Sequence, residues 1–183
     1  MLEGKKILIT GGTGSLDQAL TKLLLKSDVD TIRIFSRNEN KQVMMESALD
    51  DDRLRFFVGD VRDLSRLTRA MEDVDIVFHT AAVKNIEISE FNPIETIDTN
   101  INGTVNMIKT VIKTKPKKFI NISTDKAVDP STLYGSAKQL GERLTSWAGF
   151  HFGDTKFASL RFGNIFEANG NVFEIWEEQK QKN

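Results

Sequence analysis

The stretch that decides the fold is ILITGGTGSLD, residues 7–17. A short apolar run typical of a strand leads into a glycine-rich turn, and a helical pattern begins near Ser15. In such a strand–turn–helix unit, Gly11 permits the tight turn, and Gly14 lets the backbone approach an anion at the helix N-terminus. The predicted contacts for the diphosphate of a dinucleotide are Gly11, Thr13, Gly14, Ser15 and Leu16.

One position departs from this pattern. The last glycine of TGxxGxxG would fall at residue 17, where this chain has Asp17. The helix dipole favours a carboxylate in the first helical turn. The same carboxylate would repel a diphosphate a few Å away, at a cost on the order of 1–4 kcal/mol in a partly desolvated site. We therefore expect Asp17 to stabilise the helix and to weaken dinucleotide binding.

Short β-branched runs alternate with longer helical patterns along the chain. The expected strands are 6–10, 31–35, 54–58, 75–79, 118–122 and 157–162, and the expected helices are 15–25, 40–49, 64–71, 93–114, 134–150 and 172–180. This alternation predicts a single α/β domain over 1–183, a doubly wound parallel sheet of Rossmann type with about six strands in the order 3-2-1-4-5-6. In 93–114 we expect one buried stripe, formed by Ile94, Ile97, Ile101, Val105 and Ile108.

Composition narrows the classes of function. The 25 basic and 26 acidic side chains nearly cancel, which gives no electrostatic reason to expect a nucleic acid or an anionic membrane as partner. The chain has no cysteine, so disulfides and thiolate–metal sites are excluded. His79 and His151 lack the spacing of metal ligands, and we expect no metal. No signal peptide or membrane-spanning run is recognisable, so the expected location is the cytoplasm.

The ends of the next strands suggest which dinucleotide would bind. An NAD-selective site places an acidic residue after the second strand, but this chain has Ser36 and Arg37 there. A hydroxyl and a guanidinium suit a 2′-phosphate, so NADP is expected rather than NAD; the alternative is a solvated arginine at the start of a loop. Asp60 can accept a hydrogen bond from an adenine amino group. The remaining predicted cofactor contacts are Val61, Ala81, Ala82, Lys84, Tyr134 and Lys138.

The fifth strand leads into the candidate catalytic residues. Tyr134 and Lys138 stand four positions apart, on one face of a helix, and the segment STDKA precedes them at 123–127. An ammonium group beside a phenol favours the phenolate and lowers its pKa. Such a tyrosine can take a proton from a sugar hydroxyl while the adjacent carbon gives a hydride to a nicotinamide.

These motifs together resemble the extended short-chain dehydrogenase/reductases. More narrowly, they resemble the inverting UDP-N-acetylglucosamine 4,6-dehydratases of bacterial surface-sugar biosynthesis. The resemblance covers essentially the whole chain, through ILITGGTGS, FSRNE, RFFVGDVRD, HTAAVK, STDKAVDP, LYGSAK and RFGN. The most specific part is STDKA joined to YGxxK.

The resemblance implies a division of roles. Tyr134 and Lys138 would act in oxidation at C4 of the sugar, and Thr124 would hold the substrate or the tyrosine. Lys126 would remove the C5 proton, and Asp125 would assist loss of the C6 hydroxyl. The implied substrate contacts are Lys84, Asn85 and Asn164. The implied partners are a nucleotide sugar of the UDP-N-acetylglucosamine class, a catalytic NADP and, by analogy, further copies of the chain.

Departures from the family pattern keep other functions open. Besides Asp17, the chain has Asn85 in place of a usual histidine, and Glu167 and Asn169 in place of a glycine and an arginine of the nucleotide-sugar loop. Family members also carry a C-terminal substrate lobe, which we expect this chain to lack, as a truncated form of the family. A non-catalytic relic or dinucleotide-binding module is therefore the main alternative. A UDP-sugar 4-epimerase is a lesser one, because it would give Asp125 and Lys126 no purpose.

Overall fold

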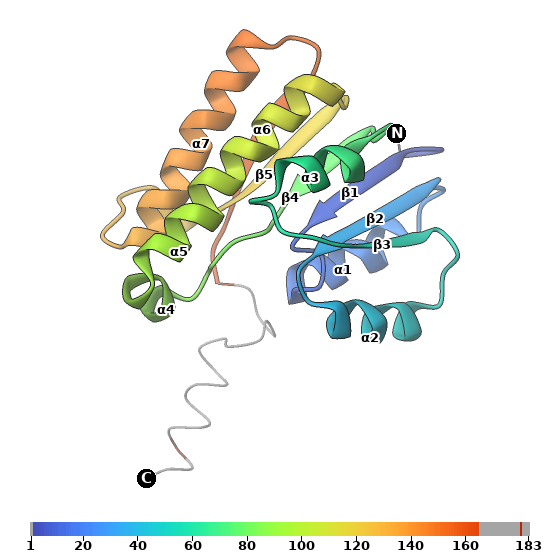
Figure 1. Ribbon diagram of the computed structural model, residues 1–183, viewed down its shortest axis with the longest axis horizontal. Helices are drawn as coiled ribbons and strands as arrows, with labels where there is room; N and C mark the ends of the chain where they lie inside the picture. Colours follow the sequence, from blue (N-terminus) through green and yellow to red (C-terminus); the bar gives the residue numbers. More distant parts are fainter. Residues whose placement is uncertain (1, 165–179, 181–183) are drawn as a thin grey trace.

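A parallel sheet forms the centre of the computed structural model, which describes residues 2–164 and residue 180 (Figure 1). Its six strands follow the order β3-β2-β1-β4-β5-β6, and all neighbouring pairs are parallel. The strands are β1 (Lys6–Thr10), β2 (Thr31–Ser36), β3 (Leu54–Val58), β4 (Ile76–His79), β5 (Lys118–Thr124) and β6 (Lys156–Phe162). The predicted Rossmann-type sheet and its strand order are confirmed.

Helices cover both faces of this sheet (Figure 1). They are α1 (Ser15–Leu24), α2 (Glu39–Leu49), α3 (Leu64–Met71), α4 (Ile86–Phe91), α5 (Pro93–Ile97), α6 (Gly103–Thr114) and α7 (Leu133–His151). Alternation along β1 shows the two layers: Leu8 packs into the core under α3 and α6, whereas Ile7 and Ile9 pack into the core under α1 and α2. Burial on both faces explains why the strand segments are apolar at consecutive positions.

The single helix expected at 93–114 is interrupted. The structure contains α5, a π-helical turn at Asp98–Asn102 and then α6. A π turn inserts extra residues into the helical repeat and changes which side chains face inward.

The predicted buried stripe is therefore wrong for its first half. Ile94 is 74% exposed and Ile97 is 39% exposed, whereas Ile108 is buried. The inward face instead carries Asn100, whose carboxamide accepts from the Val83 amide at 2.8 Å and donates to the Val83 carbonyl at 2.9 Å. Polar side chains on the buried face hold the loop that follows β4, so apolar spacing could not identify that face.

The structure contains one helix that was not predicted, and some predictions fall outside the residues that it describes. No sequence pattern predicted α4, whose N-terminus is capped by Asn85 through a 2.9 Å hydrogen bond from the Ile88 amide. The predicted helix at 172–180, and the departures Glu167 and Asn169, lie outside the described residues apart from residue 180.

The register of β1 brings the functional loops together. Thr10, the last residue of β1, pairs with Phe35 of β2 on one side and with His79 of β4 on the other. The segments that follow these three strands therefore emerge side by side at the carboxyl edge of the sheet, where open α/β sheets bind ligands.

Candidate functional site

The glycine turn after β1 packs directly on the loop after β4. Gly11 has a φ of +76°, and a Cβ there would come within 2.8 Å of the Ala81 backbone. Its amide donates to the Phe35 carbonyl at 2.8 Å, which ties the turn to the end of β2. The positive φ of Gly11 and the lack of space for a Cβ both require glycine at this position.

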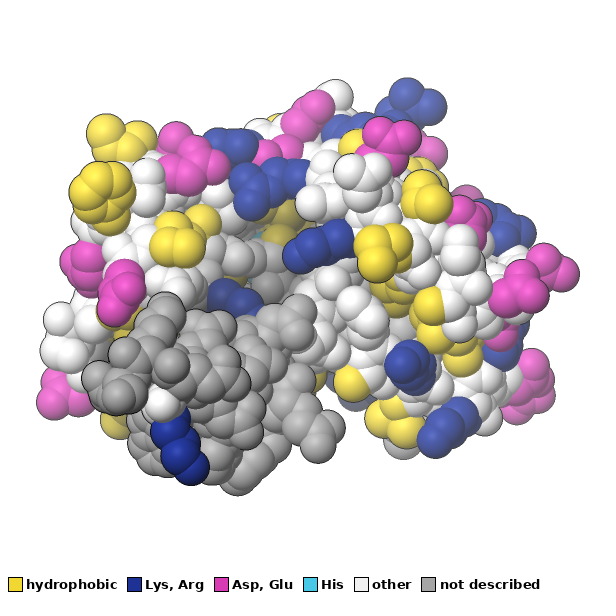
Figure 2. Space-filling model, turned by 90° about the horizontal axis from the view of Figure 1, so that it is seen from below, with side chains coloured by type: hydrophobic (Ala, Val, Ile, Leu, Met, Phe, Trp, Pro, Cys, Tyr) yellow, Lys and Arg dark blue, Asp and Glu magenta, His cyan; other side chains and the backbone are white. Residues whose placement is uncertain are grey.

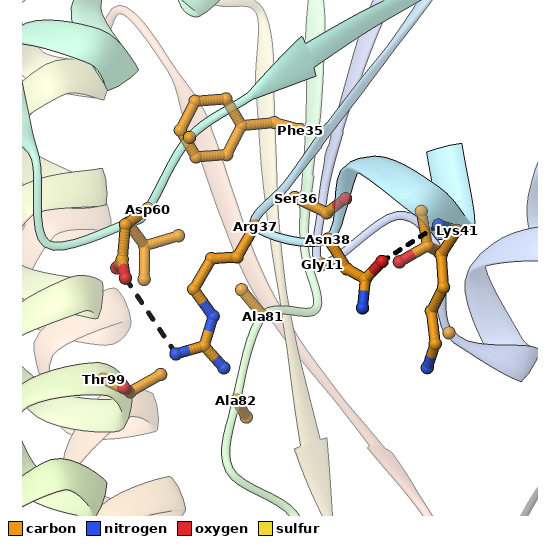
Figure 3. A pocket seen from close by; sticks show the side chains of 14 residues that line it. Gly11, Phe35, Ser36, Arg37, Asn38, Lys41, Asp60, Ala81, Ala82 and Thr99 are labelled. Carbon is orange, nitrogen blue, oxygen red and sulfur yellow. Dashed lines mark hydrogen bonds and ion pairs between the residues drawn. The ribbon is translucent and has the colours of Figure 1, made fainter. Parts of the chain in front are cut away.

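A pocket of about 320 Å³ lies beside this turn (Figure 3). Its lining includes predicted residues from four separate segments: Gly11, Thr13, Gly14, Ser36, Arg37, Asp60, Val61, Ala81 and Ala82. It also includes Phe35, Asn38, Lys41, Gly59 and Thr99, which the sequence analysis did not propose. Ser15, Leu16 and Lys84 are not among the lining residues. Seen from below, the molecule is hollowed in its centre, with basic side chains around the rim (Figure 2).

Arg37 is held by carboxylates on the far side of the pocket. Its Nη1 lies 4.0 Å from Asp60 Oδ2 and 3.5 Å from Glu95 Oε1. Arg62 contacts the same two carboxylates, at 2.6 Å and 2.9 Å. Burial raises the pKa of Asp60, but the hydrogen bonds from Arg62 and the charges of both arginines outweigh it, and the pKa falls below its usual range. Asp60 is therefore an ionised acceptor.

Ser36 is positioned by a residue that the sequence analysis missed. Gln42, buried in α2, donates from Nε2 to Ser36 Oγ at 2.9 Å and to the Phe57 carbonyl at 3.0 Å. Because Ser36 Oγ accepts this bond, its own proton remains available for donation.

Lys41 was missed as well. It extends from the first turn of α2, across the pocket from Asp60 (Figure 3). A second cation four positions after Arg37 was the available signal in the sequence.

Asp17 is buried beneath the glycine turn. The residue is 5% exposed, and its Oδ1 atom has no hydrogen-bond partner. A Cβ added to Gly14 would lie 2.7 Å from Asp17 Oδ2, so the carboxylate fills the space below that residue. Burial raises the pKa of Asp17 to about 6, although the Thr80 hydroxyl, the Gly14 amide and the charge of Lys84 oppose the rise.

Lys138 is buried at the centre of the carboxyl edge. Its Nζ donates to the Ile122 carbonyl at 2.8 Å. Burial lowers the pKa of Lys138 to about 8, while the carboxylates of Asp17 and Glu142 act in the opposite direction. Near neutral pH the side chain therefore exchanges a proton more readily than an exposed lysine.

The expected effect of Lys138 on Tyr134 is not found. Burial raises the pKa of Tyr134 above its usual value, and the charge of Asp125 adds to the rise. A hydrogen bond with Thr124 is the interaction that lowers it. Desolvation dominates because the phenol is mostly enclosed and the ammonium of Lys138 is directed to a backbone carbonyl.

The end of β5 forms a compact polar cluster. Asp125 Oδ1 accepts from Thr124 Oγ1 at 2.9 Å and from Lys126 Nζ at 3.1 Å. These two partners hold the pKa of Asp125 below its usual range. Lys126 Nζ also donates to Asn164 Oδ1 at 3.4 Å, so Asn164 joins the cluster.

The helix that carries Tyr134 and Lys138 is pressed against this cluster. A Cβ at Gly135 would come within 2.5 Å of the Lys126 carbonyl oxygen, so α7 can approach the turn only with glycine at this position. The structure thus brings together Thr124, Asp125, Lys126, Tyr134 and Asn164, whereas Lys138 is directed to the Ile122 carbonyl. The side-chain oxygen of Asn85 is instead occupied in capping α4.

His79 is a buried neutral histidine in the core. Its Nδ1 lies 2.8 Å from Thr10 Oγ1, and its Nε2 lies 3.1 Å from Thr104 Oγ1. Thr104 already donates to the Asn100 carbonyl, so it accepts from Nε2–H and Thr10 donates to Nδ1. Burial lowers the pKa of His79 to about 3, with a further contribution from Lys138. No cluster of three or more potential metal ligands occurs among the described residues.

A Rossmann-type sheet with these residues at its carboxyl edge is typical of dinucleotide-binding enzymes. Residues 7–183 match the family described as "Polysaccharide biosynthesis protein", and the chain belongs to this family. The family resemblance seen in the sequence is thereby confirmed.

Three relatives of similar identity to this chain have different descriptions. An "uncharacterized membrane protein" of Methanocaldococcus jannaschii is 44% identical over 180 residues, which are 97% of this chain and 54% of the relative. An inverting UDP-N-acetylglucosamine 4,6-dehydratase of Campylobacter jejuni is 45% identical over 175 residues, covering 94% and 52%. A UDP-glucose 4-epimerase of Rickettsia bellii is 41% identical over 189 residues, covering 100% and 55%.

The solved structure of Pen from Bacillus thuringiensis is similar throughout the chain. Its TM-score is 0.96 at 37% identity, with 100% of this chain and 58% of that chain covered. The chain thus spans about half the length of the curated relatives it matches. Among the residues that the structure describes, no helix combines the length and apolarity that a membrane crossing requires.

Proposed function

We propose that this chain is the dinucleotide-binding part of a nucleotide-sugar-modifying enzyme, specifically an NADP-dependent UDP-N-acetylglucosamine 4,6-dehydratase, which is a lyase. The observation that carries the proposal is the Asp125–Lys126 ion pair at 3.1 Å, held against the helix of Tyr134 and Lys138. An acid–base pair beside an oxidation pair is what an elimination coupled to a transient oxidation requires.

The pocket residues fit the adenosine half of the cofactor. Ser36 retains a proton to donate, and Arg37 and Lys41 supply positive charge, so these side chains would hold a 2′-phosphate. The absence of an acidic residue at the end of β2 favours NADP over NAD. When bound, the nicotinamide would accept a hydride and later return it, with no net redox change. Asp17 is the residue of this site that opposes the fit.

The ion pair can generate the acid and the base in one step. In the resting pair the proton resides on Lys126, because Asp125 has a lowered pKa. Transfer of that proton across the 3.1 Å contact would leave a neutral amine and a neutral carboxylic acid. The amine would then take the C5 proton of the sugar, and Asp125 would protonate the departing C6 hydroxyl as water. Both groups would return to their starting charges.

A UDP-sugar 4-epimerase is the second candidate. The Rickettsia relative, 41% identical over the whole of this chain, supports it directly. Tyr134 and Lys138 would serve such an enzyme, but the Asp125–Lys126 pair would have no part in the reaction. A non-catalytic dinucleotide-binding module is the third, and buried Asp17 is the observation in its favour.

Product mass separates these functions. Because the chain spans about half of its relatives, the assay uses residues 1–164 with Asp17→Gly, joined to the remaining half of the Campylobacter dehydratase. We expect UDP-N-acetylglucosamine to lose one water, and the activity to disappear with Lys126→Ala. The unfused chain should show little conversion, since substrate positioning supplies roughly 7–11 kcal/mol of barrier lowering.

Other products would favour other functions. A product of unchanged mass with inverted C4 would support the epimerase. No conversion by the fusion, together with measurable dinucleotide binding, would support the binding module. Water loss that survives Lys126→Ala would overturn the role given to this base.

A further inference from the structure

Asp17 is buried at the turn that would receive the diphosphate, and one of its carboxylate oxygens has no hydrogen-bond partner. It lies in the first turn of the ten-residue helix α1, and the residue is 5% exposed. Its Oδ1 atom has no hydrogen-bond partner. A buried carboxylate oxygen without a donor is rare in folded proteins, because desolvation of an ionised group is costly.

The carboxylate lies directly beneath the turn whose amides an anionic ligand would use. Asp17 Oδ2 lies 2.7 Å from the position of a Cβ on Gly14, and the Gly14 amide interacts with the carboxylate. Amides at a helix N-terminus are the groups that bind the phosphates of a dinucleotide. An ionised Asp17 beneath this turn therefore repels a diphosphate bound to it.

The charged neighbours of Asp17 come from two other elements. Lys84, in the loop after β4, and Lys138, in α7, both interact with its charge. The Thr80 hydroxyl contributes a further interaction. Burial nevertheless outweighs them and keeps the pKa of Asp17 at about 6, close to neutral pH.

We propose that Asp17 makes dinucleotide binding dependent on a proton: the glycine turn accepts a diphosphate when Asp17 is protonated and disfavours it when Asp17 is ionised. This inference rests on the cofactor assignment of the proposed function. The neutral acid carries no charge and does not repel the diphosphate. At pH values above the pKa of Asp17, ligand binding then requires Asp17 to take up one proton.

The sign of the pH dependence follows. Below about pH 6 Asp17 is protonated in the free protein, so the affinity is at its highest and changes little. Above that pH each further unit would weaken binding by up to about tenfold, because one proton must be taken up on binding.

The test is calorimetric titration of the whole chain with NAD, whose diphosphate does not titrate near neutral pH, from about pH 5.5 to about 7.5. This range stays below the pKa of about 8 at Lys138. We expect the unmodified chain to bind about tenfold more weakly at pH 7.5 than at pH 6.5, with proton uptake visible in buffers of different ionisation enthalpy. Asp17→Asn should bind with nearly constant affinity, at least about tenfold tighter than the unmodified chain at pH 7.5.

Asp63→Asn is the matched control, since Asp63 is a helix-capping carboxylate outside the pocket lining. It should retain the pH dependence of the unmodified chain. If Asp17→Asn and the unmodified chain bind NAD equally at every pH, the proton dependence is overturned and the cofactor assignment stands. If neither binds NAD or NADP at any pH, the cofactor assignment falls together with it. Should Asp17→Asn fail to fold, a flat profile for the unmodified chain still overturns the proposal.

Discussion

The Lys126 carbonyl oxygen lies so close to Gly135 that an added Cβ would come within 2.5 Å of it. This contact sets the spacing between the turn that carries Asp125 and Lys126 and the helix that carries Tyr134 and Lys138. Backbone on one side meets backbone on the other, so neither can yield by a simple side-chain rotation.

Gly135→Ala should therefore move α7 away from the turn and destabilise the protein. We expect the free energy of unfolding to fall by about 1–3 kcal/mol, as in other overpacked sites, measured by urea denaturation. The matched control is Gly153→Ala, where an added Cβ meets nothing within 4 Å. It should change stability by less than about 0.5 kcal/mol. Equal losses for the two variants would contradict this role of Gly135.

Asp17→Asn should stabilise the free protein at neutral pH. The pKa of Asp17 rises from 3.8 to about 6 on folding, so the folded state binds the proton more tightly. Its contribution to stability is fully present below about pH 4 and is lost as the pH rises through about 6. The shift corresponds to about 3 kcal/mol, which the variant should recover at pH 7.5. Urea denaturation at several pH values measures this, and a variant no more stable than the parent would refute it.

His79→Leu should destabilise the core and alter its response to acid. The Thr10 and Thr104 hydroxyls would each lose a partner, and the free energy of unfolding at pH 7.5 should fall by about 2–4 kcal/mol. The pKa of His79 falls from 6.5 to about 3 on folding, so its contribution is present above pH 6.5 and lost as the pH falls towards 3. The variant should lack that acid-dependent loss. An unchanged pH profile would mean that other groups cause it.

Lys41→Ala should weaken NADP binding about tenfold or more and leave NAD binding nearly unchanged. The reason is that Lys41 would contact only the 2′-phosphate, which NAD lacks. Calorimetric titration with both dinucleotides measures the difference. Lys22→Ala, an exposed lysine in the last turn of α1, is the control. Arg37→Ala should act in the same direction as Lys41→Ala. NAD affinity equal to or tighter than that for NADP in the unmodified chain would overturn the choice of NADP.

Much of this architecture was readable from local patterns. The apolar runs and their alternation with helices predicted the sheet, its strand order and the glycine turn, and the structure confirms them. The positions after β1, β2, β3 and β4 were expected to converge, and they line one pocket. Parallel strands share a carboxyl edge, so residues at strand ends are neighbours whatever the details of packing.

Other features depended on contacts between distant segments. Spacing could not show that Asn100 bonds to Val83, or that a π turn rotates Ile94 and Ile97 outward. It predicted that Lys138 would lower the pKa of Tyr134, whereas burial raises it.

The sequence by itself determined the alternation of strands and helices, the glycine turn and nine of the residues that line the pocket, because these follow from periodicity and from backbone conformations that are local. Only the tertiary structure decided the ionisation of Asp17, Lys138 and Tyr134. The pKa of a side chain depends on how much water surrounds it and on charges brought near by other elements, and neither quantity is a property of neighbouring residues in the chain.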